Sequence, residues 1–419
     1  MSREKWGKVL AAVVLVGLLA GCQNEKAATE AGMTDVAVTE NTTAETTTAE
    51  TTTTTAEMAD SQETAAVEEI NTDPSNITVT TQEIISNMRI GWNLGNTMDA
   101  TGMDETAWGN PYTTQEMIDA VAGAGFNTVR IPVTWYTHMD GNDQIDEKWL
   151  ARVKEVIDYC MANDMYVIIN THHETSWLIP DEAHYEAVEK QYKTMWKQIA
   201  NYYRDYDEHL IFEGLNEPRV EGGENEWNGG TKEGRDVVNR LLQVFVDTVR
   251  ATGGNNSNRT LLVTTFAASA TEQAVADLVV PEDANIGVSI HAYAPYHFTF
   301  CTNEAAELFQ WDGTQKKGLE DIFALLDQYF LSKGIPVIMT EFGAQVKVLE
   351  ETGDVNLEDR IAWVQDYVSI ATEHGIPCIW WDNGYFTNGN EFFGLLNRRN
   401  CEWFEPELVE AMVKATESK

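Results

Sequence analysis

Two glutamates, each placed near the end of an expected strand, are the residues of this 419-residue chain best suited to acid–base or nucleophilic chemistry. Glu217 closes the stretch LIFEGLNE (210–217), and Glu341 lies in the stretch IPVIMTEF (335–342). A buried carboxylate without a partner is costly, so each is expected to be paired, to face a cleft or to be kept for catalysis. Across a cleft, one could protonate the leaving oxygen of a glycosidic bond while the other attacks the anomeric carbon or activates water.

Parallel strands are the elements that would have to position this pair. From residue 77 onward, short runs rich in Val and Ile alternate with amphipathic stretches typical of helices. The expected strands are 89–96, 127–133, 165–173, 210–217, 260–266, 285–293, 335–342 and 376–383. The expected helices include 114–124, 147–163, 184–206, 233–252, 319–333 and 357–374. This α/β alternation predicts a (β/α)8 TIM barrel; the alternative is an open doubly wound sheet, but no Gly-rich nucleotide-binding motif follows any strand.

Polar and aromatic side chains gather where the expected strands end, which is where (β/α)8 enzymes assemble their sites. They are Asn96, Arg130, His172, His173, Asn216, His291, Tyr293 and the pair Trp380 and Trp381. Arg130 and Tyr293 are expected to keep Glu341 ionised as a nucleophile, with a pKa that differs from that of the acid, Glu217. Flat aromatic rings suit the apolar faces of sugars, so Trp135 is added as a substrate-binding candidate.

Glu213 and the stretch THHET (171–175) receive other interpretations. Glu213 shares side-chain parity with Glu217, so it would point into the barrel and need a partner there, such as Arg130. THHET suggests zinc, but HExxH is absent and adjacent histidines on a strand would point to opposite faces. We therefore expect no metal and no organic cofactor, because both chemical steps can use carboxylates.

The overall composition restricts the partners. The formal net charge of −39 repels nucleic acid, so we expect no nucleic-acid partner and a neutral substrate. We also expect a monomer. Four cysteines follow residue 22 and are widely scattered: Cys160, Cys301, Cys378 and Cys401. Their spacing argues against a metal knuckle and leaves both disulfides and free thiols open.

The amino-terminal segment is typical of an exported protein. Arg3, Lys5 and Lys8 precede an apolar run, and the run ends in LAGC, which resembles the bacterial lipoprotein box with Cys22 as the lipidated residue. An ordinary cleaved signal is the alternative. Residues 1–21 are thus predicted as a signal peptide, 22–74 as a disordered Thr/Ala/Glu linker and 75–419 as the catalytic domain. We expect a cell-surface lipoprotein anchored in a membrane by lipid on Cys22.

The strand-end motifs resemble those of glycoside hydrolase family 5, the cellulase family of retaining (β/α)8 glycosidases. LNEPR (215–219) is similar to its acid/base motif and MTEFGA (339–344) to its nucleophile motif. VRIPVTW, THHE, HAYAP and IWWDNG are similar to its other signatures, in the same order, over roughly residues 79–416. The resemblance implies double displacement with retention, Glu217 as acid/base and Glu341 as nucleophile. It also implies that Arg130, His172, Asn216, His291, Tyr293 and one of the paired tryptophans, for which we choose Trp381, complete the site.

The stretches GWNLGNTMDA (91–100) and WWDNG (380–384) are most similar to the endoglucanase branch of the family. The resemblance therefore implies an endo-β-1,4-glucanase acting on a β-glucan polysaccharide. A xyloglucanase, a mixed-linkage glucanase or a β-mannanase on the same scaffold remains the alternative. A non-catalytic glycan-binding lipoprotein is the hypothesis from a different class, but it gives no reason to keep both carboxylates.

Overall fold

Eight parallel strands close into a barrel in the computed structural model, which describes residues 73–301, 309–348, 353, 355–386 and 391–417. They are β1 (Ile90–Leu94), β2 (Thr128–Ile131), β3 (Tyr166–Asn170), β4 (Leu210–Glu213), β5 (Leu261–Ser269), β6 (Ile286–His291), β7 (Val337–Phe342) and β8 (Cys378–Asp382). Each pairs with the next along the chain, and β8 returns to β1 with Cys378 beside Ile90. The predicted (β/α)8 barrel is confirmed, and the open doubly wound sheet is wrong, because the closed sheet has no edge strands.

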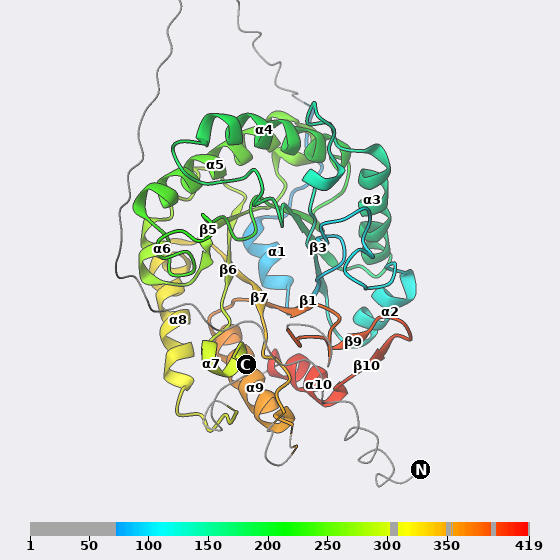
Figure 1. The fold of residues 1–419 in the computed structure, drawn as a ribbon, viewed down its shortest axis with the longest axis vertical. Coiled ribbons are helices and arrows are strands. Elements are labelled where there is room, and N and C mark those ends of the chain that lie inside the picture. Colours follow the sequence, from blue (N-terminus) through cyan, green and yellow to red (C-terminus); the bar gives the residue numbers. More distant parts are fainter. Residues whose placement is uncertain (1–72, 302–308, 349–352, 354, 387–390, 418–419) are drawn as a thin grey trace, which may run out of the picture. The chain divides into compact units, whose positions relative to one another are not determined.

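Helices surround the barrel, as Figure 1 shows. They are α2 (Gln115–Gly123), α3 (Glu147–Met161), α4 (Tyr185–Tyr202), α5 (Lys232–Ala251), α6 (Glu272–Asp277), α7 (Tyr296–Thr299), α8 (Lys316–Tyr329), α9 (Leu357–Glu373) and α10 (Pro406–Ala415). Three 3-10 turns, η3 (Tyr136–His138), η4 (Gly254–Ser257) and η6 (Leu331–Lys333), and a small ribbon of β9 (Leu396–Asn397) with β10 (Glu402–Trp403) complete the described elements. The start of α5 is set by Thr231, whose side chain accepts a hydrogen bond from the backbone N–H of Gly234.

Helix α1 (Thr81–Asn87), which the sequence analysis missed, lies within the ring of strands in Figure 1. Thr80 and Glu83 form a reciprocal capping box at its start. Its Ile84 and Ile85 pack in an apolar cluster with inward-facing strand residues, which are Ile168, Ile211, Leu262, Ile338 and Ile379. This cluster fills one end of the barrel with apolar side chains, so the polar groups gather at the carboxyl ends of the strands.

Strand β4 ends at Glu213, so the expectation that Glu217 is the last residue of this strand is wrong. Beyond the end of β4, Asn216 still pairs with the segment after β3, since its N–H donates to the carbonyl of Thr171 at 3.1 Å. Pro218 has no N–H and cannot extend the ladder. Instead its carbonyl accepts from the N–H of Ala267 at 2.9 Å. This contact ties the segment carrying Glu217 to the end of β5.

The predicted signal peptide, Cys22 and nearly all of the predicted linker lie outside the described residues. Within the described part of the chain, no helix has both the length and the apolar character needed to cross a membrane. Cys160, Cys378 and Cys401 are free thiols, which decides the open alternative for these three.

Candidate active site

The two candidate catalytic carboxylates face each other at the carboxyl ends of the strands. Glu341 lies on β7, and Glu217 lies in the segment after β4. One carboxylate oxygen of each lies within 4.8 Å of the other. Retaining glycosidases place their carboxyl groups about 5–5.5 Å apart and inverting ones about 6.5–9.5 Å, because inversion needs room for a water. The spacing therefore favours direct attack by a carboxylate.

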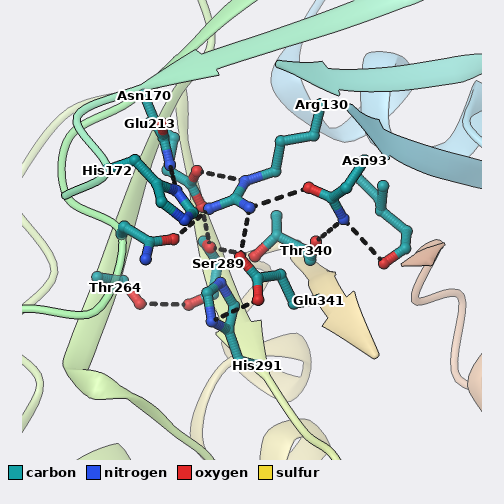
Figure 2. A network of polar contacts seen from close by, with 12 residues as sticks. Asn93, Arg130, Asn170, His172, Glu213, Thr264, Ser289, His291, Thr340 and Glu341 are labelled. Carbon is teal, nitrogen blue, oxygen red and sulfur yellow. Dashed lines mark hydrogen bonds and ion pairs between the residues drawn. The ribbon is translucent and has the colours of Figure 1, made fainter. Parts of the chain in front are cut away.

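Arg130 of β2 is the hub of the polar network drawn in Figure 2. Its Nη1 donates to Glu341 Oε1 at 2.6 Å and its Nη2 to Asn216 Oδ1 at 2.6 Å. Its Nε donates to Glu213 Oε2 at 2.7 Å, which confirms the predicted pairing of Glu213 with Arg130. Nη1 also donates to Asn93 Oδ1 at 3.0 Å. One rigid, fully buried guanidinium thus fixes the nucleophile candidate relative to the amide beside Glu217.

Tyr293 holds the second oxygen of Glu341. Its hydroxyl donates to Glu341 Oε2 at 2.8 Å. The Tyr293 ring packs against Phe300 and Phe393, with centroids 5.2 and 5.5 Å away. Burial and the charge of Glu341 raise the pKa of Tyr293 well above its ordinary value, so the phenol stays a donor. Because both oxygens are held, the orientation of the Glu341 carboxylate is fixed.

Glu217 is the more accessible carboxylate. Its side chain is 20% exposed, against 6% for Glu341. His291 Nδ1 donates to Glu217 Oε1 at 2.9 Å and lies 3.6 Å from Glu341 Oε2. A carboxyl group held on one side and open on the other suits proton exchange with a leaving group and with water.

The pKa order of the pair is opposite to the expected one. Burial is the largest influence on both carboxyls, and it raises the pKa of Glu341 against the opposing charges of His291 and Arg130. For Glu217, the hydrogen bond and charge of His291 outweigh burial and lower the pKa. The order is reversed because His291 donates directly to Glu217. The sequence gives no sign of this contact, so the prediction could not include it.

His291 couples the two carboxyls into one titrating unit. Burial opposes its protonation, but the charges of Glu341 and Glu217 and the hydrogen bond to Glu217 raise the pKa of His291 overall. When His291 loses its proton, Glu217 loses an important charge that favours its ionised form. The different exposure and hydrogen bonding of Glu217 and Glu341 therefore distinguish the candidate acid/base from the candidate nucleophile better than their pKa values do.

His172 presents a defined hydrogen-bond donor. Asn170 Oδ1 accepts from the N–H of Val133 at 3.0 Å, which orients its amide so that Nδ2 donates to His172 Nδ1 at 3.2 Å. Burial lowers the pKa of His172 well below its ordinary value, so the ring is neutral and its proton lies on Nε2. The ring also stacks on Trp381, with centroids 5.7 Å apart and planes 3° apart.

His173 lies beside His172, with ring centroids 4.5 Å apart, so the expectation that the two point to opposite faces is wrong. Strand β3 ends at Asn170, and the strand alternation no longer applies after it. Ligand atoms of Asp99, His172 and His173 lie within 4.8 Å of one another. However, the hydrogen bond from Asn170 occupies His172 Nδ1 and places the proton on Nε2, so this set suits a metal poorly.

The remaining candidates divide into site and core. Trp380 is fully buried and donates from Nε1 to the carbonyl of Phe393 at 2.9 Å, whereas Trp381 lies on His172. Trp135 is also fully buried, and its Nε1 donates to the carbonyl of Asn170 at 2.8 Å, so its assignment to substrate binding is wrong. Asn96 is half-buried and adopts a positive φ of 54°, with its N–H bonded to Asp99 Oδ2.

Three residues near the pair were not predicted. Asn93 is fully buried and binds Arg130. It is the polar residue within the expected strand stretch GWNLG (91–95), and this pattern could have identified it. Arg219, inside LNEPR, donates to the carbonyl of Glu217 at 3.3 Å. Glu391 follows β8, and burial together with the charges of Glu341 and Glu217 raises its pKa. No spacing pattern pointed to Glu391, because it lies outside any strand or helix.

A closed (β/α)8 barrel with two carboxylates at this spacing, flanked by an arginine, a tyrosine and a tryptophan, defines a glycoside hydrolase of the retaining type. Residues 93–387 match the family model described as cellulase (glycosyl hydrolase family 5). The chain belongs to this family.

The chain is also similar to named endoglucanases and to solved endoglucanase structures. Endoglucanase A of Ruminococcus albus is 50% identical over 343 residues, which cover 80% of this chain and 93% of that protein. The solved structure of a GH5-4 broad specificity endoglucanase from Clostridium longisporum is 42% identical with a TM-score of 0.76, covering 81% of this chain and 99% of that one. A xyloglucan-specific endo-β-1,4-glucanase from a metagenomic library is 44% identical with a TM-score of 0.75, covering 79% and 97%.

Proposed function

We propose that this protein is a retaining endo-β-1,4-glucanase in which Glu341 is the nucleophile and Glu217 the acid/base. The observation that carries the proposal is the spacing of the two carboxylates, with oxygens within 4.8 Å of each other. Similarity to endoglucanase A of Ruminococcus albus supports the activity.

The first step is the attack of Glu341 on the anomeric carbon. The C1–oxygen bond to the leaving chain breaks as a bond from Glu341 to C1 forms, and Glu217 gives its proton to the departing oxygen. Arg130 and Tyr293 hold the two oxygens of Glu341 in line for this attack. We assign His172 Nε2 and Asn216 to the binding of sugar hydroxyl groups beside the breaking bond.

The second step is hydrolysis of the glycosyl-enzyme. Glu217, now ionised, takes a proton from water, and the resulting hydroxide forms a bond to C1 as the bond to Glu341 breaks. Glu341 regains its negative charge here, so Arg130 and Tyr293 stabilise it as it leaves. Two inversions at C1 give net retention.

Glu341→Gln tests this function directly. The variant keeps the shape of the side chain but removes the anionic nucleophile, so hydrolysis of a soluble β-glucan should fall by at least about 10⁴-fold. Wild-type-like hydrolysis by the variant would contradict the assignment. Neither step needs a metal, so wild-type rates should be unchanged after dialysis against EDTA, and loss of activity there would contradict a cofactor-free mechanism.

The substrate range is proposed to include both plain and substituted β-1,4-glucans. The similarity to a broad specificity endoglucanase and to a xyloglucan-specific one supports this range. Initial rates on carboxymethyl-cellulose, xyloglucan, lichenan and mannan, measured side by side, distinguish these alternatives. A rate on mannan far above the others would replace the glucanase assignment with a mannanase.

We also propose that the protein is exported and retained at the cell surface by lipid on Cys22, as a monomer. The charged and apolar segments before LAGC (19–22) support export and lipidation. A labelled fatty acid should be incorporated into the wild-type protein and not into Cys22→Ala. Equal incorporation into the two proteins would contradict the anchor.

A further inference from the structure

A second buried glutamate lies inside the barrel next to the nucleophile. Glu213, at the end of β4, and Arg130 are both fully shielded from solvent. Burying an ion pair inside a barrel costs desolvation energy that apolar side chains would avoid. The proposed mechanism assigns Glu213 no part, so its presence needs another explanation.

Two routes connect Glu213 to Glu341, and Figure 2 shows both. In the first, Arg130 donates from Nε to Glu213 Oε2 and from Nη1 to Glu341 Oε1, at 2.7 and 2.6 Å. In the second, Ser289 donates to Glu213 Oε1, and its Oγ lies 2.5 Å from the Oγ1 of Thr340. Thr340 directly precedes Glu341. A change in the charge of Glu213 therefore reaches Glu341 through the shared Arg130, and it reaches the residue before Glu341 through Ser289.

One guanidinium serves two carboxylates in this arrangement. The charged and titratable groups around Glu341 are Arg130 from β2, Glu213 beyond it on β4, Glu217 after β4, His291 and Tyr293 at the end of β6, and Glu391 after β8. A cation paired only with Glu341 would stabilise its anion more strongly. A more stable anion is a weaker nucleophile, so sharing the cation favours attack.

We propose that Glu213 is a positioning residue of the reaction: it fixes the plane of the Arg130 guanidinium and takes part of its charge, which keeps Glu341 reactive. This inference rests on the proposed function, since it presupposes that Glu341 attacks C1. It extends the site to a residue that does not touch the substrate.

Glu213→Gln isolates the charge, because the variant can keep every hydrogen bond. Its amide oxygen can accept from Arg130 Nε, and its amide nitrogen can donate to Ser289 Oγ, whose proton then turns to Thr340 Oγ1. The fold is therefore expected to survive the change.

The assay is inactivation by 2,4-dinitrophenyl 2-deoxy-2-fluoro-β-cellobioside across a pH series. Glu341 forms a bond to C1 and dinitrophenolate leaves with the electron pair, so the rate reports attack alone. Removing one negative charge a guanidinium's width away should move the acidic limb of the pH–rate profile to lower pH by about two units at an effective dielectric constant of about 20. The plateau rate should fall about tenfold.

Ser289→Ala should move the acidic limb in the direction opposite to that of Glu213→Gln. Without the hydroxyl donor, the negative charge of Glu213 interacts more strongly with Arg130. Arg130 then stabilises the Glu341 anion less, so the acidic limb of the pH–rate profile should move to higher pH. The matched control is Glu105→Gln. Glu105 is also a buried carboxylate paired with an arginine, since its Oε2 lies 2.6 Å from Nε of Arg152 on α3. The control should lose thermal stability without any shift of the limb.

An unchanged limb and plateau rate in Glu213→Gln, with only a lower Tm, would make Glu213 merely structural and overturn the inference. A limb that moves in the same direction in Glu213→Gln and Ser289→Ala would also overturn it. Failure of the reagent to label the wild-type enzyme would instead reject the proposed function, so the two failures are distinguishable.

Discussion

Tyr293→Phe removes the donor to one oxygen of Glu341 and leaves the ring packing in place. The lost bond, 2.8 Å long, joins a phenol to a carboxylate. A hydrogen bond to a charged group contributes about 1.5–3 kcal/mol, which corresponds to roughly a 10- to 150-fold change in rate. The effect should appear in the second step, where Glu341 leaves as an anion. We expect kcat on an activated aryl cellobioside, for which that step limits the rate, to fall about 10- to 150-fold.

The same variant should move the pH profile in a defined direction. Tyr293 donates to the ionised form of Glu341, so its removal raises further a pKa that burial already raises. The acidic limb of kcat/KM should therefore move to higher pH, by about one unit. Tyr367→Phe is the control, because the buried Tyr367 hydroxyl donates to the carbonyl of Ala292 at 2.9 Å and not to a carboxylate. A limb that stays in place or moves to lower pH in Tyr293→Phe would refute the role given to Tyr293.

Three further experiments test other parts of the account. Glu217→Ala should lower turnover of polysaccharide by at least about 10²- to 10⁴-fold, and azide should restore turnover of an activated aryl glycoside as the β-glycosyl azide; an α-azide would exchange the roles of the two glutamates. Trp381→Ala should raise KM for cello-oligosaccharides about tenfold, whereas Trp380→Ala, which removes a fully buried ring, should cost about 3–5 kcal/mol of stability and leave the KM of the folded enzyme nearly unchanged; equal effects on KM would contradict the different placements. Ala267→Gly should change the free energy of unfolding by less than about 0.5 kcal/mol, because the positive φ of 55° offsets the usual cost of glycine, whereas Ala200→Gly in α4 should cost about 1.5 kcal/mol; equal losses in chemical denaturation would show that Ala267 carries no strain.

The barrel could be predicted because each strand is buried on both faces and reads as a continuous apolar run. Expected and observed strands differ by a few residues at their ends, as at β4, where the chain leaves the ladder at Glu213 before Pro218. Helix α1 was missed, since its apolar residues pack inside the end of the barrel and its seven residues are too few to show a clear period.

The composition of the site could be read from the strand ends, but its electrostatics could not. Arg130 and Tyr293 reach Glu341 as expected, because strand ends in a barrel converge. The pairing of His291 with Glu217 and the burial of Trp135 depend on side-chain directions after the strands end, where the period of two no longer applies. Glu391 lies outside any strand or helix, where the sequence has no periodic signal.

Mass spectrometry of the trapped glycosyl-enzyme tests the central claim most directly. Wild-type protein treated with the 2-deoxy-2-fluoro cellobioside reagent should gain one fluorocellobiosyl group, and peptide mapping should place it on Glu341. Glu341→Gln should gain none. A label on Glu217, or rapid turnover with α-configured first product and no trapped species, would contradict double displacement through Glu341.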